Sequence, residues 1–178
     1  MSSNVQLHSW WSLSDALRRQ VLGLQIDPVQ TEYAGTIERA ISSLGETEDE
    51  NMAGLAILRS GEGVGFVVLK RGDKAPAWAA PGWAVVSAMR VDRRQQGGGV
   101  GSQALVALSP WLRQHWPACH TLALAVDEEN ARGIKAYTRA GFADAGQREQ
   151  GRIGWVRYMH KPVGAQGSHE VSQVTPRC

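Results

Sequence analysis

The chain of 178 residues is 43% hydrophobic and 20% charged, and it has a net charge of +2 at pH 7. These values are typical of one globular domain, so they exclude a largely disordered chain, and so small a charge gives no reason to expect nucleic-acid binding. No apolar run approaches the ~20 residues of a membrane span, and the N-terminal residues lack the order of a signal peptide. The two cysteines, Cys119 and Cys178, form no disulfide framework, so we expect a cytoplasmic protein without membrane contact.

The charge is unevenly distributed. Residues 1–50 contain eight acidic and three basic residues, a net charge of −5, and the remainder therefore carries +7. An acidic region beside a basic one suits a protein that handles a cationic and an anionic ligand together. A solvated acidic helix face explains the same pattern, so the distribution alone decides nothing.

Two helices are predicted near the N-terminus, over residues 12–24 and 31–44, because apolar residues recur there at helical spacing. Ser12 or Ser14 can cap the first helix, and Gly45 ends the second. Asp27-Pro28 between them marks a turn. A polar acidic loop, residues 46–51, follows.

Three strands are expected next. The apolar runs 53–58 and 63–69 are joined by Arg59-Ser60-Gly61-Glu62, which is a hairpin signal. A loop rich in Gly, Pro and Ala follows at 71–81, and residues 83–91 form the longest strand candidate. A polar stretch, residues 92–96, then leads into a glycine-rich segment.

The C-terminal half alternates helices and strands. A helix begins at Val100, and Ser109-Pro110 predicts a kink or a second helix, since proline removes an amide donor. A strand at 122–126, a helix at 127–140 and a hairpin at 143–150 and 152–160 complete a mixed α/β chain. The domain is expected to span residues 1–162. Residues 163–178 lack periodicity and are expected to form a mobile tail.

The segment from Gln96 to Ser102 contains four glycines and lies between a strand and a helix. Glycine lets the backbone bend freely and lets a ligand approach it closely, and amides at a helix N-terminus bind phosphate. Arg90, Arg93 and Arg94 add positive charge nearby. The pattern indicates a phosphate-binding loop.

Two well-known phosphate loops compete for this segment. The nucleotide-hydrolase loop needs Lys-Ser or Lys-Thr after its last glycine, but Ser102-Gln103 stands there, so that reading fails. Residues 99–104 fit the dinucleotide fingerprint, and Asp127 ends the next strand. Five polar residues, 92–96, nevertheless separate the fingerprint from its strand, and the chain has too few parallel units. A dinucleotide-binding protein stays as the weaker alternative.

A third pattern covers more of the chain. Gln96-Gly97-Gly98-Gly99-Val100-Gly101 resembles the acyl-CoA loop of the GNAT superfamily of N-acetyltransferases, (Arg/Gln)-x-x-Gly-x-(Gly/Ala), and it follows the strand end at the family's usual distance. The family's downstream motif is matched by five residues in register: Asn130, Gly133, Tyr137, Gly141 and Phe142. The resemblance spans about residues 53–162.

The resemblance implies a GNAT-like fold, a mixed and mostly antiparallel sheet with parallel, splayed fourth and fifth strands and helices on both faces. It implies acetyl-CoA as the acyl donor and cosubstrate. Tyr137 matches the usual general acid, which protonates the departing thiolate. The expected coenzyme contacts are Met89, Val91, Gln96, Gly97, Gly98, Gly99, Gly101, Ser102 and Asn130. A backbone N–H within residues 87–91 would stabilise the oxyanion.

The acceptor implied is a small-molecule primary amine bound by a monomer or homodimer. In the ribosomal-protein alanine acetyltransferases a glutamate base precedes the motif asparagine by five residues, and Ala125 stands there, so a protein acceptor is disfavoured. Asp127, Glu128 and Ser87 are candidate bases, and none is singled out. Glu32, Tyr33 and residues 46–50 could line the amine site, with Trp10, Trp11, Trp78 and Trp83 shaping it.

The five histidines show no ligand spacing, so no metal site is expected. One alternative from another functional class stays open: an acyl-CoA-binding regulatory module without turnover. The lack of an evident base favours such a module slightly, and Tyr137 argues against it.

Overall fold

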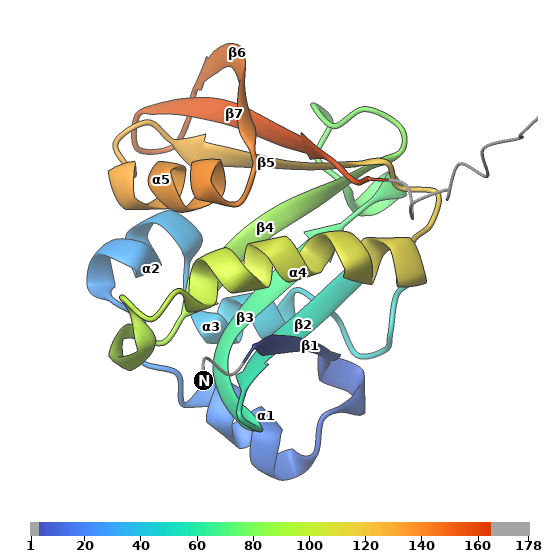
Figure 1. The fold of residues 1–178 in the computed structure, drawn as a ribbon, viewed down its shortest axis with the longest axis vertical. Helices are drawn as coiled ribbons and strands as arrows, with labels where there is room; N and C mark the ends of the chain where they lie inside the picture. Colours follow the sequence, from blue (N-terminus) through green and yellow to red (C-terminus); the bar gives the residue numbers. More distant parts are fainter. Residues whose placement is uncertain (1–3, 165–178) are drawn as a thin grey trace, which may run out of the picture.

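A computed structural model describes residues 4–164, so the predicted tail lies outside the described residues from residue 165 onward. A seven-stranded sheet organises the chain, in the order β1-β2-β3-β4-β5-β7-β6 (Figure 1). The strands are β1 (Val5–Ser9), β2 (Met52–Arg59), β3 (Glu62–Lys70), β4 (Trp83–Val91), β5 (Thr121–Asp127), β6 (Ala143–Gln150) and β7 (Trp155–Pro162). Of the strand pairs in residues 4–164, β4 and β5 are parallel and the others are antiparallel.

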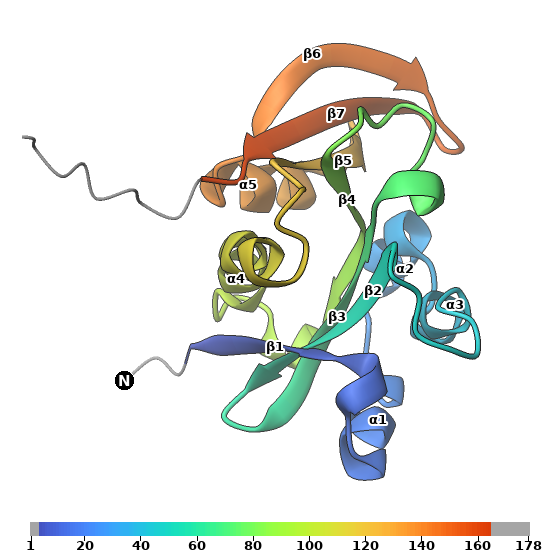
Figure 2. The ribbon, with the colours of Figure 1, turned by 90° about the vertical axis from the view of Figure 1, so that its right-hand side faces the viewer.

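Helices lie on both faces of this sheet, as Figure 2 shows from the side. The helices are α1 (Asp15–Leu22), α2 (Pro28–Ala34), α3 (Ile37–Ser42), α4 (Val100–His115) and α5 (Ala131–Arg139). Side chains of α4 and α5 pack on one face with Leu55, Val67 and Leu124, and we call it the α4/α5 face. Side chains of α1 and α3 pack on the other with Phe66 and Val68, and we call it the α1–α3 face.

The parallel pair β4 and β5 separates along its length. Trp83, Ala84 and Val85 pair with Thr121, Leu122 and Ala123, and the pairing ends there. The remainder of β4 stays paired with β3, and the remainder of β5 stays paired with β7. The mixed sheet with splayed fourth and fifth strands is therefore confirmed, and its antiparallel pairs exclude the fully parallel sheet that the dinucleotide alternative needs.

The N-terminal region differs from the prediction in two places. Val5–Ser9 forms an edge strand paired with β2, which the sequence reading missed. The expected helix at 31–44 is two helices, because Gly35 has a φ of 77° and the Thr36 side chain caps a new helix by accepting the amide of Arg39. Asp27 caps α2, with Pro28 in its first turn.

The predicted second helix at Ser109 is wrong, since α4 continues through Pro110. An internal proline costs about 3 kcal/mol. Leu105, Leu108 and Leu112 are fully buried on this helix, and burial of each contributes about 1.5–3 kcal/mol. The free energy gained by burying these leucines therefore exceeds the cost of the proline within the helix. Among residues 4–164, none of the helices has the length and apolar character that crossing a bilayer requires.

Candidate active site

The splay leaves one edge of β4 without a strand partner. The amide of Asp92 donates to the carbonyl of Val64 on β3 at 2.9 Å. Successive amides of a strand point to opposite edges, so the amide of Val91 points toward β5, where the pairing has ended. Met89 lies two residues earlier and packs against the core on the α4/α5 face. This edge can donate a hydrogen bond to a ligand seated between the strands.

The glycine-rich loop connects this edge to α4. Gly97 and Gly99 have φ values of 85° and 78°, which only glycine adopts readily. Gly99 is the N-cap of α4 and supplies no side-chain cap. Within the described residues, the four amides that follow one another from Gly99 to Ser102 have no hydrogen-bond acceptor. Open amides at the positive end of a 16-residue helix form an anion site.

Three of the loop glycines, Gly97, Gly99 and Gly101, leave free space above the backbone, whereas Gly98 lies close to Arg59. A Cβ atom at Gly101 would have Met89 Cε as its nearest neighbour, at 3.5 Å, and one at Gly97 would meet no described atom within 4 Å. Internal packing therefore does not require glycine at Gly101. The open surface is suited to a ligand that approaches the main chain, as the diphosphate of a coenzyme does.

Two arginines that the sequence reading missed contact this loop. Arg59, at the end of β2, donates to the carbonyl of Gly98 at 3.0 Å and to the Gln103 side chain at 3.2 Å. Arg132, in the first turn of α5, donates to Gln96 Oε1 at 2.9 Å. The sequence offered one usable signal, because Arg132 comes two residues after the motif asparagine.

The arginines predicted to surround the loop have other partners. Arg90 is buried on the α1–α3 face, where its guanidinium donates to the carbonyls of Ala34 and Gly35 at the end of α2. Arg94 is bound to the Asp92 carboxylate at 2.8 Å. These two therefore hold the scaffold of the site, and Arg59 and Arg132 supply the positive charge on the loop.

Asp92 fixes the start of the loop. Its side chain, 3% exposed, accepts the backbone amides of Gln25 and Arg94 at 3.0 and 2.9 Å as well as the Arg94 guanidinium. These hydrogen bonds hold the pKa of Asp92 well below its ordinary value, and the hydrogen bond from the Arg94 side chain has the largest effect.

We expect Asp92→Asn to lower the free energy of unfolding by ~1–3 kcal/mol at pH 7, because charge-assisted hydrogen bonds are lost. A depressed carboxyl pKa stabilises the fold above the unfolded-state pKa of ~3.9, and this contribution disappears as pH falls. The difference between the variant and the wild type should therefore be smaller at pH 3. Chemical denaturation at both pH values measures it, and an equal difference at the two would contradict the assignment.

Two of the motif residues lie at the start of α5. Asn130 caps the helix by accepting the amide of Gly133 at 2.9 Å. A Cβ at Gly133 would lie 2.5 Å from Asn130 Nδ2, which explains the glycine. Asn130 thus has a structural role, and its predicted coenzyme contact stays a prediction.

Tyr137 packs against the core of the α4/α5 face, edge-on to Phe142 with ring centroids 6.1 Å apart. Burial alone raises the pKa of Tyr137 to about 12, and no side chain of the described residues hydrogen-bonds its hydroxyl. A phenol with this pKa keeps its proton at neutral pH. It is suited to donate that proton and unsuited to act as a base.

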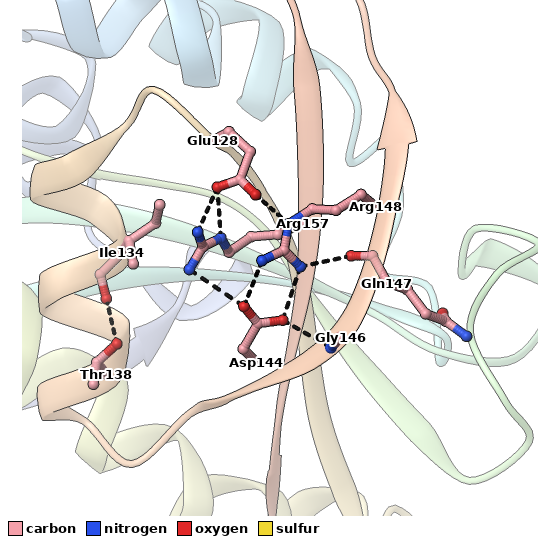
Figure 3. A network of polar contacts seen from close by, with 8 residues as sticks. All are labelled: Glu128, Ile134, Thr138, Asp144, Gly146, Gln147, Arg148 and Arg157. Atoms are coloured by element: carbon pink, nitrogen blue, oxygen red, sulfur yellow. Dashed lines mark hydrogen bonds and ion pairs between the residues drawn. The ribbon is translucent and has the colours of Figure 1, made fainter.

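Two of the candidate bases, Glu128 and Asp127, have different surroundings. Glu128 binds the guanidinium groups of Arg148 and Arg157, which together also hold Asp144 (Figure 3). These contacts lower the pKa of Glu128, and the hydrogen bond from Arg157 has the largest effect. Glu128 is therefore a poor base. Asp127, at the end of β5, has a raised pKa because it is partly buried. A raised pKa favours proton uptake at neutral pH.

The predicted acceptor-site residues are not all brought together. Residues 46–50 precede β2, at the end of the sheet where β4 begins, and are therefore remote from Val91 at its other end. Trp10 is in the core, and Trp11 lines a hollow of about 660 Å³ beside that acidic loop. Trp78 contacts Tyr158 of β7, and Trp83 contacts His160 of β7 at the end where β4 and β5 are still paired.

Within residues 4–164, no three or more His, Cys, Asp or Glu side chains are grouped so as to hold a metal ion.

Comparison with known proteins gives a consistent picture. Residues 10–142 match the model of the acetyltransferase (GNAT) family. A relative described as the uncharacterized N-acetyltransferase YbbJ of Bacillus subtilis (strain 168) is 27% identical over 108 residues, which cover 60% of this chain and 68% of the relative.

Two solved structures illustrate the similarity in fold. The aminoglycoside acetyltransferase AAC(6')-Ib in complex with coenzyme A is 19% identical, with a TM-score of 0.69 over 89% of this chain and 94% of that one. The spermidine N-acetyltransferase of Vibrio cholerae in complex with CoA and spermine is 15% identical, with a TM-score of 0.67 over 89% and 95% of the two chains. At these identities the likeness concerns the fold alone.

Proposed function

Since the chain belongs to the GNAT family of acetyltransferases and is thus an acetyl-CoA-dependent acyltransferase, we propose that it acetylates the primary amine of a small molecule, with Tyr137 as general acid. The observation that carries this proposal is that two features lie next to each other. The unpaired edge of β4 is joined directly to a helix N-terminus whose amides are open.

The residues present fit the coenzyme. Its diphosphate would lie on the amides from Gly99 to Ser102, with Gln96, Gly97 and Gly98 forming the preceding turn and Arg132 close by. Its pantetheine arm would follow the open edge of β4, where Val91, and by resemblance Met89, supply hydrogen bonds and contacts. Asn130 would contact the same arm from the start of α5.

In the proposed reaction, the attacking amine and the leaving thiolate lie on opposite faces of the sheet. The thioester carbonyl lies in the splay, where a β4 amide stabilises the charge that develops on its oxygen. The amine attacks from the α1–α3 face, its nitrogen–carbon bond forms, and the carbon–sulfur bond breaks. The thiolate leaves toward the α4/α5 face and takes the proton of Tyr137, which is protonated at neutral pH. The acylated nitrogen releases its extra proton to solvent, and solvent reprotonates Tyr137.

A small acceptor is favoured by one feature of the sequence. Ala125 stands where the ribosomal-protein alanine acetyltransferases have a glutamate base, so the feature expected of a protein-N-terminus enzyme is missing. The solved structures of similar fold include proteins named for aminoglycoside, spermidine and ribosomal-protein alanine acetylation, so the fold does not distinguish these acceptors. We place this transferase domain at residues 1–162.

The test is steady-state release of free CoA thiol from acetyl-CoA with a panel of polyamines, amino acids, aminoglycosides and peptides. We expect release with at least one small amine, and an equal amount of acetylated amine by mass spectrometry. Tight binding of acetyl-CoA with no thiol release for any amine would instead identify a non-catalytic acyl-CoA module.

A further inference from the structure

An exposed patch of the sheet lies over Ala125 of β5 on the α1–α3 face. Ala125, in the middle of β5, is exposed, although its neighbours Leu124 and Val126 are 1% and 4% exposed on the opposite face. The α1–α3 core cluster takes its sheet residues from β2 and β3 and, among residues 4–164, none from β5 or β7. An exposed alanine on an inner strand means that none of the described helices covers this part of the sheet (Figure 2).

The strand register fixes the residues around this exposed patch. Alternation along β5 puts Asp127 on the same face as Ala125. Ala125 is paired with Tyr158, and Asp127 is paired with Val156, which is in turn paired with Glu149 on β6. Asp127, Val156 and Glu149 therefore form one row across three strands. At ~4.8 Å per strand, the backbones of the two acidic residues are about 10 Å apart.

Aromatic rings lie beside the row of the two carboxylates. Trp78, from the loop between β3 and β4, packs on Tyr158 with ring centroids 4.7 Å apart and planes at 46°. The Tyr158 hydroxyl donates to Glu149 Oε2, and this hydrogen bond is the main reason that the pKa of Tyr158 is raised to about 12. Ring faces that end at a carboxylate make a binding surface for an organic cation.

Two arginines of the β6–β7 hairpin lie on the other face of the sheet, and a third, Arg152, lies close enough to Asp127 to lower its pKa. Arg148 and Arg157 are paired with each other across β6 and β7, and both bind Glu128 and Asp144 on the other face of the sheet (Figure 3). In the described part of the chain, the arginine that lowers the pKa of Asp127 is Arg152, which also donates to the Glu32 carbonyl. Glu32 and Glu129 add negative charge beside Asp127.

Resting on the proposed function, we infer that this exposed patch selects an acceptor with two amino groups separated by an aliphatic chain. The remote ammonium group lies over Tyr158 and Trp78 and pairs with Glu149. The reacting amine lies above Ala125, beside the splay, where Asp127 accepts the proton that its ammonium form must lose. The free amine then attacks, the nitrogen–carbon bond forms, and the thiolate leaves to the opposite face.

The inference is tested with cadaverine, a linear diamine, and pentylamine, the monoamine of the same chain length. For the wild type, kcat/KM for cadaverine should exceed that for pentylamine about 10–100-fold, the range of a charge-assisted contact. Glu149→Gln should remove this preference while leaving pentylamine turnover unchanged. The side chain of Glu149 is exposed on an edge strand, so the variant should fold normally.

Glu62→Gln, an equally exposed carboxylate in the β2–β3 hairpin, is the matched control and should keep the preference. Equal kcat/KM for the two amines in the wild type, or a preference that survives Glu149→Gln, would overturn the inference. So would thiol release with other amines in the panel but not with cadaverine; in both cases the transferase function would stand. Absence of release with every amine would instead remove the proposed function, and this inference with it.

Discussion

Replacing Tyr137 with phenylalanine should lower kcat by roughly 10²–10⁴-fold, the contribution of a general acid. The substitution removes one oxygen and keeps the ring that packs against Phe142 and the core. The hydroxyl has no side-chain partner among residues 4–164, so its loss leaves no buried side chain unsatisfied there. The melting temperature and the dissociation constant of acetyl-CoA should therefore change little, because the lost interaction exists only as the thioester breaks.

Phe142→Leu is the matched control for ring packing. It removes the edge-on contact with Tyr137 but keeps the hydroxyl, and Phe142 is 2% exposed. We expect this variant to melt at a lower temperature and to retain most of its turnover. If Tyr137→Phe gave near-normal turnover with a lowered melting temperature, the tyrosine would be a packing residue and the general-acid role would be lost.

Gly101→Val should weaken acetyl-CoA binding by at least about 100-fold, equivalent to ~2.8 kcal/mol. A side chain here projects toward Met89 and Val91, across the path proposed for the coenzyme, and covers the open amides. The protein itself accommodates the new Cβ at ordinary contact distance, so the fold should persist. Calorimetric titration of the folded variant measures the loss.

Gly99→Val should also abolish binding, but its φ of 78° adds backbone strain to the steric effect. Gly45 provides the matched control, since it has the same φ of 78°, lies outside the site, and has no described atom within 4 Å of the position that a Cβ would occupy. Gly45→Val should lose similar stability and bind acetyl-CoA normally. Unchanged affinity for acetyl-CoA in both loop variants would refute the proposed binding of the coenzyme to this loop.

The parts of the site that could be predicted from the sequence are local in the chain. The glycine loop and the five motif residues between positions 130 and 142 each lie within one short segment, so their spacing alone identifies them. Strand β4 and helix α4, which flank the loop, carry long apolar runs. Short elements gave weaker signals: the five residues of β1 alternate in burial, but a strand of that length is hard to recognise.

Other features depend on contacts between distant segments. Arg59 and Arg132 reach the loop from β2 and α5, and Arg90 turns to the opposite face, which no local pattern specifies. The row that joins Asp127 to Glu149 exists only through the register of three strands. A shift of one residue in either pairing would move a carboxylate to the other face. The face of the sheet on which each of these side chains lies could therefore be learned only from the structure.

In the proposed complex, acetyl-CoA binds across the open edge of β4 and the first turn of α4. Heteronuclear amide spectra of the labelled protein detect this binding directly, because glycine amides give well-separated signals. On titration with acetyl-CoA, we expect shifts for the amides of Val91, Gly99, Val100, Gly101 and Ser102, and none for Gly45 or Gly61. Shifts confined to other parts of the chain, with these five amides unmoved at saturation, would contradict it.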